Sequence, residues 1–256
     1  MDLEKELDYA YDLIVERFSV NFTKPKILTG DEHESKFIER TCLNDFARPS
    51  PQMIIDDETN TIFVPDILLP DGDFIPHHRN EYDRLYDLLH ESGHSLISQL
   101  NYNLLLSRVS KLAEGNEIER EKGETLFVFH EGMAHYIAIE ACRNSEDNKL
   151  IEKANEMEKD VTDLLKQWLK LNLTYSSKIY GIDSSDWRKV VIIYLRRNKG
   201  AAIFWKYQLG YHFTSSLKPG NIVEVIKNPP ENYEELLYPN VYKKRLKMLS
   251  YRSPNS

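Results

Sequence analysis

One short stretch of the chain, His90-Glu91-Ser92-Gly93-His94, has the residue types and spacing of a zinc-binding motif. Residues four apart on an α-helix differ by only about 40° of rotation and about 6 Å of rise, so the two imidazoles leave the same face. Both can bind one Zn²⁺ ion at about 2.0–2.1 Å. Glu91 lies beside them, where its carboxylate can take a proton from a metal-bound water. The stretch predicts a Zn²⁺ cofactor with His90 and His94 as ligands and Glu91 as general base; the alternative is a chance match.

A catalytic zinc site usually has a third protein ligand and one open position. A downstream segment offers three candidates, His130, Glu131 and His135. Glu131 and His135 are four residues apart and would share a helix face, whereas His130 is one position off it. The pair His77-His78 is a further candidate, although a histidine pair in a Pro- and Gly-containing loop is also typical of solvated surface.

The two segments together resemble the gluzincin peptidases, whose third zinc ligand is a glutamate on a second helix after the HExxH helix. In the zinc aminopeptidases of that group the glutamate lies in an Asn-Glu-Gly-Phe-Ala-x-Tyr type of segment, and residues 130–136 here read His-Glu-Gly-Met-Ala-His-Tyr. The resemblance covers about residues 85–140 and implies Glu131 as the third ligand. It also implies that Gly132 and Ala134 keep this helix slim where it lies against the HExxH helix. The interval from His94 to Glu131 is longer than in the aminopeptidases, and their Gly-x-Met-Glu-Asn segment is absent. The resemblance therefore implies a gluzincin type of site without identifying the family within the group.

A peptidase of this type also needs a hydrogen-bond donor for the oxyanion that develops during hydrolysis, commonly a Tyr or a His. Several gluzincin-like hydrolases carry a Tyr-x-x-Gly helix late in the chain, and residues 207–210 look similar. We expect Tyr207 in this role, with Tyr211 and His212 as alternatives, and His135 as a second catalytic candidate. The competing interpretation of each is aromatic packing in the core.

Metal-bound histidines usually donate their other N–H group to a carboxylate or a backbone carbonyl. Asp87, three residues before His90, is one candidate acceptor, and Glu124 and Glu140 are others. An acid on an exposed helix face is the ordinary interpretation of Asp87.

The elements that must position these residues are a small N-terminal sheet followed by a helical majority. Apolar residues at three- and four-residue steps predict helices, and β-branched runs around a polar turn predict a hairpin. The expected helices are 2–18, 80–106, 124–143, 147–172, 184–197, 200–217 and 239–250, and the expected strands are 26–29, 53–55 and 61–64. The predicted fold class is α+β, mainly α, and the resemblance implies a zincin-like arrangement.

The strand Thr61–Val64 is followed by Pro65 and Pro70. Proline cannot donate to a β-ladder, so a strand bounded in this way is plausible at a sheet edge. In zincins an edge strand beside the HExxH helix pairs with an extended peptide substrate, and Thr61–Val64 could be that strand. The alternative is an ordinary hairpin strand.

Length and composition limit the remaining choices. The chain has 256 residues, which fits a single domain over 1–256, with a possible subdivision into 1–106 and 107–256. The net charge of −8 predicts no nucleic-acid partner, and the basic residues at 243–247 read as one solvated helix face. No apolar run approaches the roughly 20 residues that cross a bilayer, and no signal peptide is evident, so we expect a soluble, cytoplasmic protein without a membrane partner. Two isolated cysteines, Cys42 and Cys142, indicate no disulfide framework.

Together these features favour a zinc metallopeptidase that hydrolyses peptides or proteins through a metal-bound water activated by Glu91. One alternative is a zincin-like binding or regulatory module without activity, although such a module has no chemical need for Glu91. Another is a zinc hydrolase of a small, non-peptide amide. The oligomeric state stays open.

Overall fold

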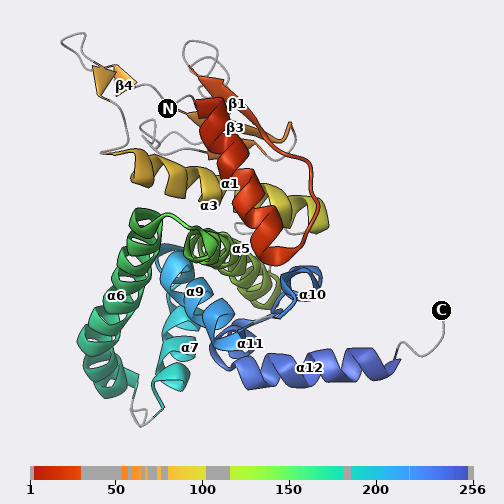
Figure 1. The fold of residues 1–256 in the computed structure, drawn as a ribbon. Helices are drawn as coiled ribbons and strands as arrows, with labels where there is room; N and C mark the ends of the chain where they lie inside the picture. Colours follow the sequence, from red (N-terminus) through yellow and green to blue (C-terminus); the bar gives the residue numbers. More distant parts are fainter. Residues whose placement is uncertain are drawn as a thin grey trace. The chain divides into compact units, whose positions relative to one another are not determined.

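The fold is taken from a computed structural model of the chain. The described residues are 3–29, 54–56, 59–64, 67–68, 74–75, 80–101, 116–180, 186–218 and 220–252. These residues are mainly helical with a small three-stranded sheet, which confirms the α+β, mainly α class (Figure 1). The chain divides into two compact units. The first unit contains 1–99 and 137–155, and the second contains 100–136 and 156–256. The expectation of one domain over 1–256 stays a prediction.

The first unit combines the sheet with two complete helices. Its elements are α1 (Leu3–Phe18), β1 (Lys26–Thr29), β2 (Ile54–Asp56), β3 (Thr61–Val64), the paired strands β4 (Ile67–Leu68) and β5 (Phe74–Ile75), and α3 (Glu81–Leu100). It also includes residues 137–144, the last part of α5 (Glu117–Asn144), and the start of α6 (Asn148–Tyr180). The predicted helix 2–18 and the predicted hairpin are confirmed.

The prediction that Thr61–Val64 is an edge strand is wrong. β3 lies in the middle of the sheet, parallel to β1 on one side and antiparallel to β2 on the other, and all four of its residues are buried. Val64 is the last paired residue of β3, and Pro65 lies outside the described residues. Strand β1 lies more than thirty residues earlier in the chain and takes the side that a peptide would need. The outer strands of this sheet are β1 and β2.

Helix α3 begins at a capping asparagine and carries the segment His90–His94 in its buried middle. The side chain of Asn80 accepts hydrogen bonds from the backbone N–H groups of Tyr82 and Asp83, both at 2.9 Å. From Leu88 to Ser98 every residue of the helix is buried. Arg84 donates two hydrogen bonds to the buried carboxylate of Glu6 on α1, at 2.5 and 2.6 Å, which fixes the first turn of α3 against α1. The helix ends at Leu100, earlier than the predicted 106.

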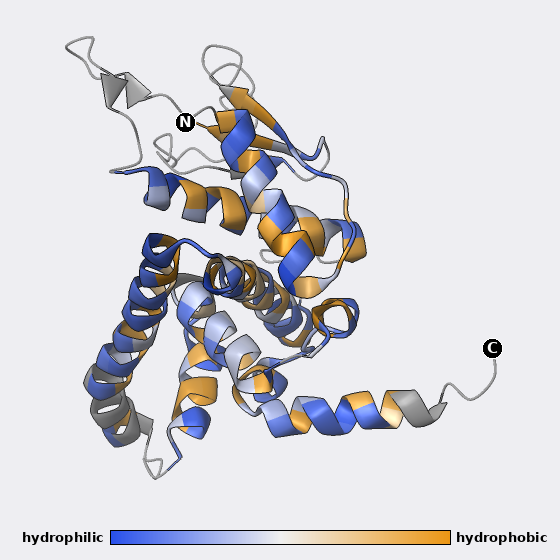
Figure 2. Cartoon of the chain, viewed as in Figure 1, coloured by the Kyte–Doolittle hydropathy of each residue, from blue (hydrophilic) through white to orange (hydrophobic). Residues whose placement is uncertain are grey.

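The second unit is helical throughout its described part. It contains 117–136 of α5, most of α6, α7 (Trp187–Arg197), α8 (Ala201–Phe204), α9 (Lys206–Leu217), α10 (Ile222–Lys227), α11 (Tyr233–Leu237) and α12 (Pro239–Arg252). These helices carry both apolar and hydrophilic residues, as amphipathic helices do (Figure 2). The predicted break at Gly200 is confirmed, since Gly200 adopts a left-handed φ of 76° between α7 and α8. The helices predicted at 147–172 and 239–250 are present as α6 and α12.

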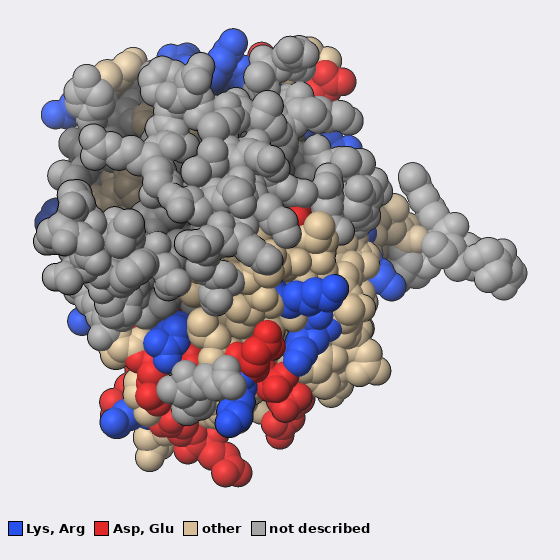
Figure 3. Space-filling view, turned by 90° about the horizontal axis from the view of Figure 1, so that it is seen from above, with Lys and Arg blue, Asp and Glu red and all other residues tan. Residues whose placement is uncertain are grey.

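The surface mixes charges of both signs. On the described part of the face in Figure 3, acidic and basic side chains lie next to one another. Among the described residues, none of the helices combines the length and the hydropathy that a bilayer crossing requires.

Candidate metal centre

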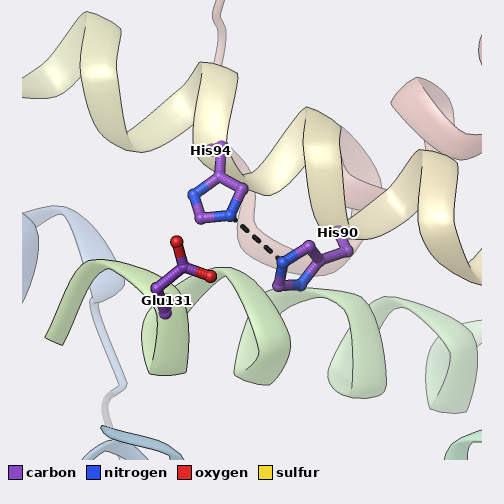
Figure 4. A group of neighbouring side chains, drawn as sticks. All are labelled: His90, His94 and Glu131. Atoms are coloured by element: carbon purple, nitrogen blue, oxygen red, sulfur yellow. Dashed lines mark hydrogen bonds between the residues drawn. The ribbon is translucent and has the colours of Figure 1, made fainter. Parts of the chain in front are cut away.

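The structure groups the three residues expected to hold the metal. His90, His94 and Glu131 each offer one ligand atom, and these atoms all lie within 4.8 Å of one another (Figure 4). The three residues are buried, with exposed fractions of 9%, 2% and 6%. Within the described part of the chain, no other group of three or more such side chains has this spacing.

The two histidines have the geometry that a shared metal ion requires. Their Nε2 atoms lie 3.1 Å apart and their ring planes are almost perpendicular, at 86° (Figure 4). Two nitrogens bound tetrahedrally to one zinc ion at 2.0–2.1 Å would be about 3.3 Å apart. Two imidazole nitrogens and one carboxylate oxygen are a donor set that suits zinc. The residue types present therefore fit the predicted ion.

The carboxylate of Glu91 is held by the sheet. Glu91 is 9% exposed, and its Oε2 accepts a hydrogen bond of 2.9 Å from the backbone N–H of Ile55 on β2. Ile55 pairs with Ile62 in the antiparallel register, yet its N–H is used by Glu91. This places Glu91 beside the outer edge of β2. A backbone donor of this kind leaves no signal in the sequence, so this contact could not be predicted.

Glu131 is held by a cation from α9. The Nζ atom of Lys206 lies 3.2 Å from Oε2 of Glu131. The same ammonium group lies over the rings of Phe127 and Tyr207, at 5.1 and 4.7 Å from their centroids. Lys206 was not among the candidates expected from the sequence, although it directly precedes the Tyr207-x-x-Gly210 pattern.

A contact between two glycines brings α9 against α5. A Cβ atom added to Gly132 would lie 2.1 Å from the carbonyl carbon of Gly210, and one added to Gly210 would lie 2.1 Å from the carbonyl oxygen of Val128. No side chain fits in this space, so the backbones touch directly. Gly132 was expected to make room for the HExxH helix, but the helix that fills the space is α9. Two segments noted in the sequence, Glu131-Gly132 and Tyr207-x-x-Gly210, meet at this contact.

The candidate oxyanion donors separate into two groups. His135 is one helical turn after Glu131 on α5. Its ring centroid lies 5.7 Å from those of both Tyr207 and Tyr211. Tyr211 donates a hydrogen bond of 2.6 Å to Glu158. His212 instead packs against the ring of Trp187 on α7, at 5.6 Å, and burial lowers its pKa, with a smaller contribution from Arg188. Tyr207 and His135 are thus neighbours in the second unit, and their catalytic roles stay predictions.

The other carboxylates and histidines considered from the sequence have different environments. Glu124 accepts hydrogen bonds from Gly200 and Tyr233, and Glu140 pairs with Arg17 and Arg143. Asp87 is half-buried on α3, and His130 is fully buried outside the metal group. His77 and His78 lie outside the described residues.

Cys142 is a free, buried thiol whose pKa is raised to about 12 by burial, which leaves it poorly suited to metal binding.

No family model, curated protein or solved structure matches this chain.

Proposed function

We propose that this chain is a zinc-dependent peptidase of the gluzincin type, with a zincin-like fold. His90, His94 and Glu131 would hold the ion and Glu91 would act as general base. The observation that carries the proposal is the burial of two imidazole nitrogens and one carboxylate oxygen within 4.8 Å of one another. Two imidazole nitrogens and one carboxylate oxygen grouped in this way are a donor set that suits zinc.

Bound zinc would supply the Lewis acidity that lowers the pKa of a water molecule and polarises the substrate carbonyl. Glu91 would accept the proton of the attacking water and return it to the leaving amine. The hydrogen bond from Ile55 to Oε2 favours a fixed orientation of this carboxylate. Holding the base in place before the substrate arrives reduces the entropy lost in reaching the transition state.

Tyr207 and His135 are the side chains proposed to stabilise the oxyanion. Their rings contact one another, and His135 is one turn from the ligand Glu131 on α5. A phenol or an imidazole N–H directed at the developing charge would contribute most when it is fixed in advance. The proposed substrates are peptides or proteins.

The test is zinc content and hydrolysis for the wild type, Glu131→Ala and Glu91→Gln. We expect elemental analysis to find about one zinc per wild-type chain, none in Glu131→Ala, and the wild-type amount in Glu91→Gln. Cleavage of a mixed library of quenched fluorescent peptides should fall by about 10²–10⁴-fold in Glu91→Gln.

Each other outcome has a definite meaning. A wild-type protein that stays metal-free in zinc-replete buffer would show that the metal site is a coincidence. Zinc binding without cleavage of peptides or small amides would favour the inactive binding module. Cleavage of small amides alone would favour the non-peptide hydrolase. Unchanged activity in Glu91→Gln would remove Glu91 as the base.

A further inference from the structure

Lys206 forms an ion pair that is built into the second unit. Its Nζ lies 3.2 Å from Oε2 of Glu131, and the two side chains are 25% and 7% exposed. For comparison, Lys166 and Asp163 pair on the surface with exposed fractions of 70% and 42%. Exposed pairs of the second kind contribute little because solvent screens them, whereas a partly buried pair is screened less.

Two aromatic rings fix the position of this ammonium group. Phe127 precedes Glu131 by four residues on α5 and therefore lies on the same side of the helix. Its ring and the ring of Tyr207 both lie within 5.1 Å of Nζ, a distance at which the ring faces attract a cation. Lys206 is thus held by Glu131 and by one ring from each helix.

The glycine contact sets the distance between these two helices. Gly132 follows Glu131 directly, and Gly210 is one turn after Lys206, so the direct backbone contact lies beside the ion pair. Neither helix can move away without opening this contact. The backbone of Lys206 is therefore held at a fixed distance from the backbone of Glu131.

We propose that Lys206 is a positioning residue for the metal ligand Glu131. This inference rests on the proposed function. A carboxylate has two oxygens, and an ammonium group that binds one of them restricts the rotation of the whole group while leaving the other oxygen to serve as ligand. Outer partners that orient a ligand in this way are commonly worth about 10–100-fold in metal affinity.

The direction in which zinc affinity changes when the ammonium group is removed distinguishes a positioning role from a purely electrostatic one. A positive charge near a divalent cation repels it, so removing that charge alone would tighten zinc binding. Removing a positioning contact would weaken it. Lys206→Met retains the length and apolar stem of the side chain and removes the ammonium group, so the two roles predict opposite results.

The experiment measures zinc affinity by competition with a chelating dye for the wild type, Lys206→Met and Lys206→Arg. We expect about 10–100-fold weaker binding in Lys206→Met and recovery of most of the affinity in Lys206→Arg. The absorption spectrum of the Co²⁺-loaded protein should also change in Lys206→Met, because that spectrum reports the ligand arrangement. Lys153→Met is the matched control, since Lys153 forms a partly buried pair with Asp83 at 2.6 Å outside the metal group, and its zinc affinity should stay at the wild-type value.

The possible failures are distinguishable. Zinc binding by the wild type together with equal or tighter binding in Lys206→Met overturns the role of Lys206 and leaves the proposed function standing. Absence of zinc binding in the wild type overturns both. If Lys206→Met does not fold, as judged by circular dichroism, Lys206→Gln takes its place with the same expected loss, and an unchanged affinity there overturns the inference.

Discussion

Helix α5 carries two regions with buried carboxylates, and the difference between them separates a structural role from the proposed metal-binding role. In the first region, Glu121 accepts two hydrogen bonds from Arg196, at 2.9 and 3.1 Å, and one from the N–H of Tyr233. Glu124 accepts hydrogen bonds from the hydroxyl of Tyr233 at 2.5 Å and from the N–H of Gly200 at 3.1 Å. These partners are donors, so they satisfy the carboxylates and join α5 to α7 and α11.

The second region begins two turns later at Glu131. Its carboxylate pairs with Lys206 and belongs to the group that also contains His90 and His94. Neutral imidazoles bind metals through a nitrogen lone pair, as carboxylates do through oxygen. A buried carboxylate among donors stabilises the fold, whereas one among other potential ligands can bind a cation.

The largest contrast is expected between Glu124→Gln and Glu131→Gln. Glu124→Gln replaces an acceptor with an amide that must face the donors of Tyr233 and Gly200, so the free energy of unfolding should fall by about 3 kcal/mol while zinc binding persists. Glu131→Gln should lose zinc, and its metal-free form should unfold within about 1 kcal/mol of the metal-free wild type. Urea denaturation and elemental analysis provide the two measurements. Loss of zinc in both variants would show that the two regions are not separate.

The next effect concerns the glycine contact beside the second region. Gly132→Ala would force a Cβ to within 2.1 Å of the backbone of Gly210, so α5 and α9 must separate, and we expect a loss of about 3 kcal/mol in the free energy of unfolding. Gly220 is the matched control because an added Cβ there meets nothing within 4 Å. Gly220→Ala should change stability by less than about 1 kcal/mol. Equal losses in both variants would indicate that the contact contributes nothing specific.

The parts of this structure that are determined by residues close together in the sequence could be predicted. The helical pairing of His90 and His94 follows from their four-residue spacing, and the β2–β3 hairpin follows from β-branched runs around a short turn. In that turn Asn60 adopts a left-handed φ of 50°, which asparagine tolerates. Amphipathic spacing likewise indicated α1, α6 and α9.

The parts that depend on distant segments could not be predicted from local patterns. The pairing of β1 with β3 joins strands more than thirty residues apart, and the short apolar run of β1 carries no signal of its partner. For the same reason the proline after β3 suggested that this strand lies at a sheet edge, whereas β3 lies between β1 and β2. Glu131 was identified only through the resemblance, and Lys206 reaches it through a helix contact whose two glycines are far apart in the sequence.

A smaller effect is expected for two tyrosines that lie beside these regions. Tyr233 of α11 donates to Glu124 of the first region, and Tyr207 of α9 lies beside Lys206, the partner of Glu131 in the second. Burial raises the pKa of Tyr233, as does Glu124, so its hydroxyl stays protonated and donates to that carboxylate. Tyr233→Phe should lower the free energy of unfolding by about 2 kcal/mol and leave hydrolysis by the zinc-loaded protein unchanged. Tyr207→Phe should do the opposite, with a stability change below about 0.5 kcal/mol and a fall in kcat of about 10²-fold. A loss of activity in Tyr233→Phe without unfolding would place the first region in the catalytic machinery.

The smallest effect concerns a histidine outside both regions. His212 packs against Trp187, and burial lowers its pKa below the ordinary 6.5, with Arg188 as a second cause. Because the folded protein disfavours the protonated form, the unfolded chain binds more protons once the pH falls below about 6.5, and the free energy of unfolding decreases from there toward the folded pKa. Urea denaturation at pH 7.5 and 5.5 should show a larger acid loss in the wild type than in His212→Phe. The same difference should persist in a Glu131→Gln background, since a histidine outside the metal group titrates whether or not zinc can bind. A difference that disappears in that background would link His212 to the metal site and weaken the separation of the two regions.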